Sequence, residues 1–231
     1  MAIKKILLNH QPDLISLQEL RTSSHLNFLL KDSPHLKAIH HQGFINYTDS
    51  VLVINTDKFK VLEQGHFWMG PQPEEFQFGW RPALPRILIW AKLMNRKSKQ
   101  KFIFIGSHFD NLIQNLNGSA KMFTQLIERF DQPILFAGDT NITMDMPAFS
   151  HLTKKLNSVF NLQMKLKDLS QNLDNKQVCY RRKGKMFPDC IVEHILYDPE
   201  LGLTPTQITI DTSSFLEGYP SDHRPIIVDF H

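Results

Sequence analysis

The stretch Ile134-Leu135-Phe136-Ala137-Gly138-Asp139-Thr140-Asn141 decides how the fold of this chain is interpreted. An apolar run stops at a glycine, and a carboxylate and a carboxamide follow. This pattern predicts a short buried strand with Asp139 and Asn141 at its C-terminal edge. Because strand side chains alternate, we expect these two to point the same way and to meet a ligand. The same Gly-Asp-x-Asn pattern is also typical of a simple turn, so the turn stays an alternative at this point.

Apolar stretches elsewhere in the chain also run into polar pairs. The pairs are Gln18-Glu19, His108 with Asp110, Glu193-His194 and Asp222-His223. A turn gives no reason for such repetition, so it favours one site built where several strands end. The set offers oxygen ligands to Mg²⁺ or Mn²⁺, and imidazoles that can bind phosphate or exchange a proton. Taken alone, Glu19 could equally be a salt-bridged or solvent-facing side chain.

The composition describes a soluble globular protein. With 231 residues, 42% of them hydrophobic, we expect one domain over residues 1–231. No apolar run is long enough to span a membrane, and no secretory signal is apparent, so we expect a cytoplasmic monomer. The two cysteines, Cys179 and Cys190, favour a reducing compartment and argue against a structural zinc site, although one disulfide stays possible.

The charge is mildly basic, with a net +3 and a pI near 8.8, which suits a polyanionic substrate without requiring one. The dense cationic segment Tyr180-Arg181-Arg182-Lys183-Gly184-Lys185 is either a solvated loop or a phosphate contact.

Periodicity predicts alternating helices and strands. Helices are expected over 2–9, 23–31, 118–130 and 147–156, and strands over 14–18, 51–54, 59–62, 87–93, 102–106, 134–137, 190–197 and 226–230. Ser23 or Ser24 is expected to cap the second helix. The proline-rich, aromatic segment 70–85 is predicted to be a long surface loop, a kind of segment that is often functional.

Four motifs in order resemble those of the endonuclease/exonuclease/phosphatase superfamily of metal-dependent phosphoesterases. The motifs are Pro12 to Glu19, Ser107 to Asp110, Gly138 to Asn141, and Ser221 to Pro225, and residues 65–93 resemble a bacterial branch of that superfamily. The resemblance implies an α/β fold, the four-layer αββα sandwich of deoxyribonuclease I, with the site at one edge of the two packed sheets.

The resemblance also implies roles for individual residues. Glu19, Asp139 and Asp222 would bind Mg²⁺ or Mn²⁺, and Asp139 would also orient or deprotonate the attacking water. His108, Asn141, Glu193 and His223 would complete the catalytic set, and Arg86 and Asn111 are candidate substrate contacts. Phosphate diesters repel anionic nucleophiles, so such a site needs positive charge as well as a base.

Three departures from the superfamily pattern stand out. No strand bearing a metal-site asparagine precedes the first helix, so either the chain begins inside a longer product or that strand is lost. Glu193 stands where the superfamily generally has an aspartate beside the closing histidine. The second acidic residue of the superfamily pattern has no clear match in this sequence, and Asp49 is the nearest candidate.

The leading hypothesis is a Mg²⁺-dependent hydrolase that cleaves a phosphodiester by in-line attack of an activated water. A nucleic acid substrate fits the basic balance, whereas a phospholipid or inositol phosphate fits the aromatic loop from Phe67 to Trp80. The alternative from another class is a catalytically silent binding module that retains the fold.

Overall fold

The structure is a computed structural model, and it describes residues 2–20, 22–41, 48–161, 189–215 and 221–231. Its helices are α1 (Ala2–His10), α2 (Ser23–Leu30), α3 (Ile113–Ile127) and α4 (Phe149–Leu152), with 3-10 turns η1 (Val159–Asn161) and η2 (Pro199–Leu201). Its strands are β1 (Leu14–Leu20), β2 (Leu36–His40), β3 (Thr48–Asn55), β4 (Phe59–Trp68), β5 (Ile87–Asn95), β6 (Lys101–His108), β7 (Ile134–Asp139), β8 (Asn157–Ser158), β9 (Glu193–Tyr197), β10 (Pro205–Ile210) and β11 (Ile226–Phe230).

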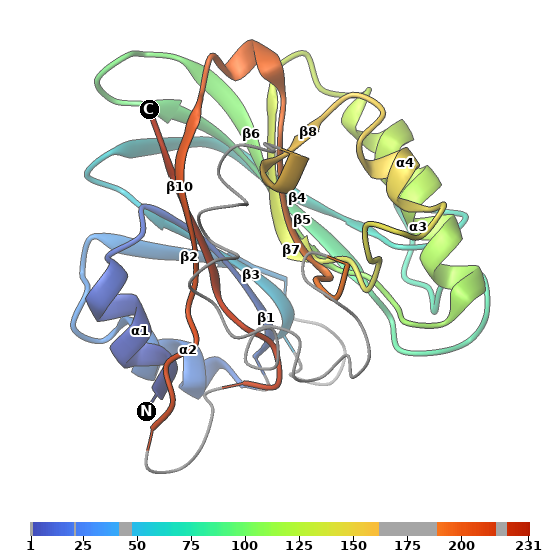
Figure 1. Ribbon diagram of the computed structural model, residues 1–231, viewed down its shortest axis with the longest axis horizontal. Helices are drawn as coiled ribbons and strands as arrows, with labels where there is room; N and C mark the ends of the chain where they lie inside the picture. The colour runs from blue at the N-terminus through green and yellow to red at the C-terminus, as the bar shows by residue number, and fades with distance from the viewer. Residues whose placement is uncertain (1, 21, 42–47, 162–188, 216–220) are drawn as a thin grey trace.

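The strands form one large sheet and two small ones. The large sheet has the order β4-β5-β6-β7-β9-β8, and only its β6–β7 pair is parallel. A second sheet has the order β1-β3-β2, and β10 pairs with β11 in a third. In Figure 1 the helices α3 and α4 cover the outer face of the large sheet, whereas α1 and α2 lie beyond the second sheet.

The buried apolar side chains divide into three layers, as this arrangement requires. One cluster, which includes Leu52 and Phe104, fills the space between the sheets. A second, which includes Phe123 and Phe136, lies between the large sheet and its helices, and a third joins α1 and α2 to β1 and β3. The alternation along each strand produces this division, because successive side chains enter opposite faces. The predicted αββα sandwich is therefore confirmed.

Among the residues that the structure describes, β1 and β11 each have one partner strand. The partner of β1 is β3, and that of β11 is β10.

Several predicted boundaries were wrong for identifiable reasons. Thr22, rather than Ser23 or Ser24, caps α2, since its hydroxyl accepts from His25 N at 3.3 Å. Helix α3 begins at Ile113 instead of 118, because Gly118 lies inside the helix where the Trp80 ring packs against it: a Cβ there would lie 2.4 Å from the ring. Helix α4 and strand β9 are shorter than expected, and β10 was not predicted.

Two compositional expectations can also be compared with the structure. Cys190 is buried and disulfide-bonded, which is the alternative that the two cysteines left open. Among the described helices, none has the length and apolar character needed to cross a membrane. The cationic segment 180–185 lies outside the described residues.

Candidate active site

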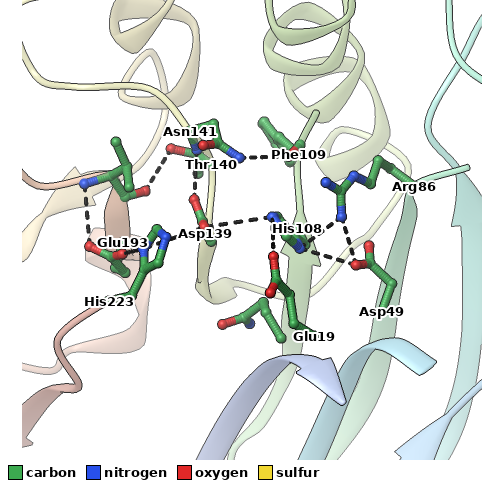
Figure 2. A network of polar contacts seen from close by, with 12 residues as sticks. Glu19, Asp49, Arg86, His108, Phe109, Asp139, Thr140, Asn141, Glu193 and His223 are labelled. Atoms are coloured by element: carbon green, nitrogen blue, oxygen red, sulfur yellow. Dashed lines mark hydrogen bonds and ion pairs between the residues drawn. The ribbon is translucent and has the colours of Figure 1, made fainter. Parts of the chain in front are cut away.

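The polar strand ends of the large sheet meet at one end of the sandwich. His108 closes β6, Asp139 closes β7 and Glu193 opens β9. These three lie side by side because the ladders pair His108 with Asp139 and Asp139 with Glu193. Glu19 in β1 and Asp49 in β3 approach from the opposite sheet (Figure 2). The repetition of polar pairs seen in the sequence thus reflects one spatial cluster, and the simple-turn alternative does not explain it.

His108 is the centre of this cluster. Its side chain is buried, and its Nε2 lies 3.6 Å from Asp139 Oδ2 and 4.0 Å from Glu19 Oε1. It therefore links a carboxylate from each of the two packed sheets (Figure 2). An imidazole in this position can balance the charge of both carboxylates or donate to an anion that lies between them.

The other side of the His108 ring is fixed by two buried residues. Arg86 Nη1 lies 2.7 Å from Asp49 Oδ1 and 2.8 Å from His108 Nδ1, and Asp49 Oδ1 lies 3.0 Å from the same nitrogen. Which proton lies between these atoms depends on the histidine tautomer, but in either tautomer Nε2 faces Glu19 and Asp139. Arg86 therefore lies behind His108 as seen from Asp139, beside Asp49 rather than beside Glu19 and Asp139 (Figure 2).

Glu193 and His223 form the opposite side of the site. A short hydrogen bond joins Glu193 Oε1 to His223 Nδ1, and that nitrogen lies 3.6 Å from Asp139 Oδ2. Glu193 Oε2 also accepts from Val192 N at 3.4 Å. The glutamate that stands where the superfamily generally has an aspartate thus reaches the histidine. Its neighbour His194 points to the other face, where it is fully buried and donates through Nε2 to Ile142 O at 2.7 Å.

Asp139 has an unusual electrostatic environment. Burial raises the pKa of its carboxyl above the ordinary value, and the negative charge of Glu193 adds to the rise. His108 and His223 act in the opposite direction without cancelling it. A buried carboxylate of this kind is well suited to take up a proton or to receive a cation.

The segment after β7 differs from the expected continuation of the strand. Asn141 has φ +53°, so strand alternation does not align it with Asp139 as we expected. Instead Asn141 N donates to Asp139 Oδ1 at 2.8 Å, and its Nδ2 donates to Phe109 O at 2.9 Å. Thr140 is buried and donates to Val192 O through both N and Oγ1. The loop therefore clamps Asp139 between the ends of β6 and β9.

The residues present fit a divalent cation. Among the described residues, Asp139, Glu193 and His223 bring ligand atoms within 4.8 Å of one another. The predicted set was instead Glu19, Asp139 and Asp222. Glu19 carries a side chain 60% exposed and backbone φ +59°, which holds its carboxylate toward His108 from a strained conformation. Asp222 is exposed, and it is not a member of the described metal-binding group.

Asp110 and Asn115 take part in the same end of the sheet, and sequence reasoning assigned no role to Asn115. Asn115 Nδ2 lies 3.0 Å from Asp110 Oδ2 and 2.8 Å from Arg81 O, and its Oδ1 accepts from Arg81 N. It thereby joins the loop after β6 to the loop before β5. Asn115 lies inside helix α3 and its partner Arg81 is 34 residues away in the sequence. No local sequence pattern therefore predicted this contact. Asn111, the predicted substrate contact, is exposed in the loop after β6.

One family model matches the chain, and several known proteins resemble it in sequence or in fold. The sequence model of the "Endonuclease/Exonuclease/phosphatase family" matches residues 2–223. The "Uncharacterized protein L388" of Acanthamoeba polyphaga mimivirus is 23% identical over 236 residues, which are 95% of this chain and 86% of that protein. The mannosyl-6-phosphatase Bt3783 of Bacteroides thetaiotaomicron has a similar structure, with a TM-score of 0.81 and 20% identity over 99% of this chain and 89% of that one. D. rerio TDP2 complexed with single strand DNA product gives a TM-score of 0.73 and 20% identity, over 99% of this chain and 90% of that one.

Proposed function

The chain belongs to the endonuclease/exonuclease/phosphatase family, and from this premise we propose that it is a metal-dependent hydrolase that cleaves a phosphodiester by in-line attack of an activated water. Phosphoester hydrolysis is the activity that family membership supports; the divalent cation, the diester and a nucleic acid substrate are the finer parts of the proposal. The observation that carries it is the meeting of Glu19, Asp139 and His108 from two different sheets, with oxygen to nitrogen distances of 4.0 Å or less.

We assign the cation to Glu19 and Asp139. Glu193 is less suited to this role because its Oε1 is already engaged by His223 Nδ1. Carboxylate oxygens are the ligands that Mg²⁺ and Mn²⁺ prefer. When bound, such a cation would supply the positive charge that a phosphoryl group requires as it accepts a nucleophile. Asp222 would assist from the solvent-facing side of the site.

The roles of the other residues follow from which atoms can donate or accept a proton at the site. Asp139 would orient or deprotonate the attacking water from its position beside His108 and Glu193. His108 is held by Arg86 and Asp49 with Nε2 toward the carboxylates, where it donates to a phosphoryl oxygen. Glu193 orients His223 through Nδ1, and the His223 ring would bind the phosphate or exchange a proton. Asn141 would contact the scissile phosphate.

The substrate class is the finest part of the proposal. One similar structure is that of a mannosyl-6-phosphatase, and another is complexed with a single-stranded DNA product, so likeness of fold alone leaves several phosphoesters open. We favour a nucleic acid because of the basic net charge of the chain.

The direct test is turnover of bis-p-nitrophenyl phosphate with Mg²⁺, Mn²⁺ or EDTA. We expect metal-dependent hydrolysis that Asp139→Ala and His223→Ala each reduce by several orders of magnitude. Asp57→Ala and His25→Ala, at exposed positions away from the site, serve as matched controls and should keep full turnover. A folded protein that turns over neither this diester nor p-nitrophenyl phosphate with any metal would instead be a silent binding module. Parallel assays of phosphatidylinositol and inositol phosphates would identify the lipid alternative.

A further inference from the structure

A groove of about 610 Å³ lies between helix α2 and strand β2, on the helical side of the second sheet. Its apolar lining comes from Leu26 and Leu30 of α2 and from Leu36 and Ala38 of β2. Leu36 and Ala38 pack against the buried cluster below α1 and α2, whereas their neighbour Ile39 faces the large sheet. Both stay partly exposed, so α2 covers this face of β2 only in part.

Strand β2 lies at one edge of its sheet. Among the described residues it pairs with β3 alone, in antiparallel register. Thr56 N donates to His35 O at 2.7 Å, and the alternation of an antiparallel ladder from this bond turns the backbone groups of Lys37 toward β3. The N–H and C=O groups of Ala38 and His40 therefore point away from β3, along the edge of the sheet. Such a row of backbone groups is a template for one further strand.

The charge of the groove is positive. Its lining includes Lys31 and Lys37 but no aspartate or glutamate. Both lysines are exposed, and neither forms an ion pair with a described residue. Asp32 lies outside the lining, and its carboxylate accepts a hydrogen bond from Lys4 Nζ at 2.5 Å. Asp57 is exposed in the turn between β3 and β4, also outside the lining. An occupant that carries carboxylates is therefore favoured.

The two faces of β2 indicate how an added strand must alternate. In an antiparallel pair, each side chain lies beside its partner on the same face of the sheet. Side chains opposite Leu36 and Ala38 enter the groove beside the leucines of α2, so apolar residues suit these positions. Side chains opposite Lys37 lie on the other face, where an acidic residue meets the exposed ammonium group.

Two other occupants fit the groove less well. A fatty acid has a carboxylate and an apolar chain, but it would leave the outward N–H and C=O groups of β2 without partners. A second copy of this chain would pair with those groups, but it would bring Lys31 and Lys37 of both copies close together. An acidic peptide segment in an extended conformation satisfies the backbone, the apolar lining and the charge together.

We propose that β2 and the groove bind an extended segment of a partner protein, in which apolar and acidic residues alternate, as an added antiparallel strand of the second sheet. In this mode of recognition the main-chain hydrogen bonds supply affinity, and alternate side chains supply specificity. None of the residues that line the groove belongs to the catalytic cluster around Asp139. The interaction surface therefore goes beyond the proposed function and does not depend on it.

The probe is a fluorescein-labelled hexapeptide of alternating valine and glutamate, and its binding is measured by fluorescence anisotropy. In the proposed antiparallel pair, the valines that enter the groove also direct their N–H groups to β2, whereas the glutamate N–H groups point away. N-methylation of the valines should therefore weaken binding by at least about ten-fold. N-methylation of the glutamates, which changes the composition equally, should leave the affinity unchanged.

Two variants locate the binding on β2. Ala38→Pro removes an outward N–H that makes no bond to β3, and Lys37→Glu reverses the charge that meets the glutamates. We expect each to weaken binding by at least about ten-fold, and Lys37→Glu to bind a hexapeptide of valine and lysine instead. Lys60→Glu, at an exposed position of β4 at the edge of the large sheet, should bind the probe normally. If Ala38→Pro does not fold, Lys37→Glu and the methylated peptides still decide the question.

Other outcomes would overturn the proposal. Absence of binding by the unmodified hexapeptide, or equal binding of the two methylated peptides, would show that β2 takes no added strand. Unchanged affinity of Lys37→Glu for the glutamate peptide would contradict the charge argument. Tighter binding of dodecanoate than of the hexapeptide would assign the groove to a fatty acid, and a dimer in sedimentation that Ala38→Pro dissociates would assign the edge to a second copy. Because anisotropy requires no turnover, these results are separate from the test of the hydrolase.

Discussion

At the scale of one residue, the buried carboxylate of Asp139 lowers the stability of the folded state at neutral pH, although the proposed reaction requires it. The unfolded chain ionises this carboxyl at its ordinary pKa, whereas burial lets the folded chain keep the proton to higher pH. The folded state therefore becomes less stable, relative to the unfolded state, as pH rises from the unfolded value to the folded one. At pH values above the folded-state pKa of Asp139, the full loss of folding stability is present.

We accordingly expect Asp139→Asn to raise the melting temperature of the metal-free protein at pH 7.5 while abolishing turnover. The gain should shrink as pH falls toward the ordinary pKa of aspartate, about 3.9. Thermal unfolding in EDTA at several pH values measures both effects.

Asp211→Asn is the matched control, because the pKa of Asp211 is lowered by folding whereas that of Asp139 is raised. Burial acts to raise the pKa of Asp211, but hydrogen bonds from Ser213 and His10 outweigh it and lower the pKa. Its carboxylate contributes stability above its ordinary pKa and loses that contribution as pH falls through the folded value. Asp211→Asn should therefore destabilise at pH 7.5. If Asp139→Asn also destabilised there, the electrostatic account of Asp139 would be wrong.

Glu19 stores strain rather than electrostatic energy. Its φ of +59° is unfavourable for any residue with a Cβ, by roughly 1–2 kcal/mol. Glu19→Gly should therefore melt at a higher temperature than Glu19→Ala, although both lose the carboxylate and should be equally inactive. Equal melting temperatures for the two variants would show that the strained backbone carries no free energy.

At the scale of elements, the parallel contact of β6 with β7 sets the distance from His108 to Asp139. Gly138 pairs with Ser107 across this contact, and a Cβ at Gly138 would lie 2.3 Å from Ser107 O. The clash is with backbone, so no side chain can move aside and the strands must separate. Gly138 is thus required by the sheet itself.

We expect Gly138→Ala to destabilise the fold by about 2 kcal/mol or more and to reduce turnover strongly. Gly202→Ala is the comparison, because a Cβ there meets nothing within 4 Å. Its φ of +65° should cost about 1 kcal/mol in stability and leave turnover unchanged. Denaturant unfolding and diester turnover report the two effects separately, and full activity in Gly138→Ala would exclude the proposed role of the strand spacing.

The elements themselves could be predicted where the pattern is local. Strands such as β5 and β7 were predicted from buried apolar runs, and α1 from its single apolar face. Helix α3 was misplaced because Gly118 is required by packing against Trp80, which the local sequence does not reveal. Strand β10 was missed because its apolar and polar residues alternate only weakly. It is stabilised by antiparallel pairing with β11, which lies later in the sequence.

At the scale of the whole molecule, the sandwich brings residues far apart in the sequence to one end of two sheets. The motifs predicted which strand ends carry chemistry, and four of their residues, Glu19, His108, Asp139 and His223, do meet. The pairing of Arg86 with Asp49 and His108 could not be predicted, because it joins both sheets. Nor could the positive φ at Asn141, which turns its amide to Phe109.

The central claim is that Glu19 and Asp139, brought together from opposite sheets, hold the divalent cation. Calorimetric titration of Mn²⁺ into the metal-free protein tests it most directly. We predict one binding event that Glu19→Gln and Asp139→Asn each weaken by about ten-fold or more, and that the exposed control Glu63→Gln leaves unchanged. Absence of binding, or binding that only Glu193→Gln and His223→Ala weaken, would contradict the claim and move the cation to the other side of the site.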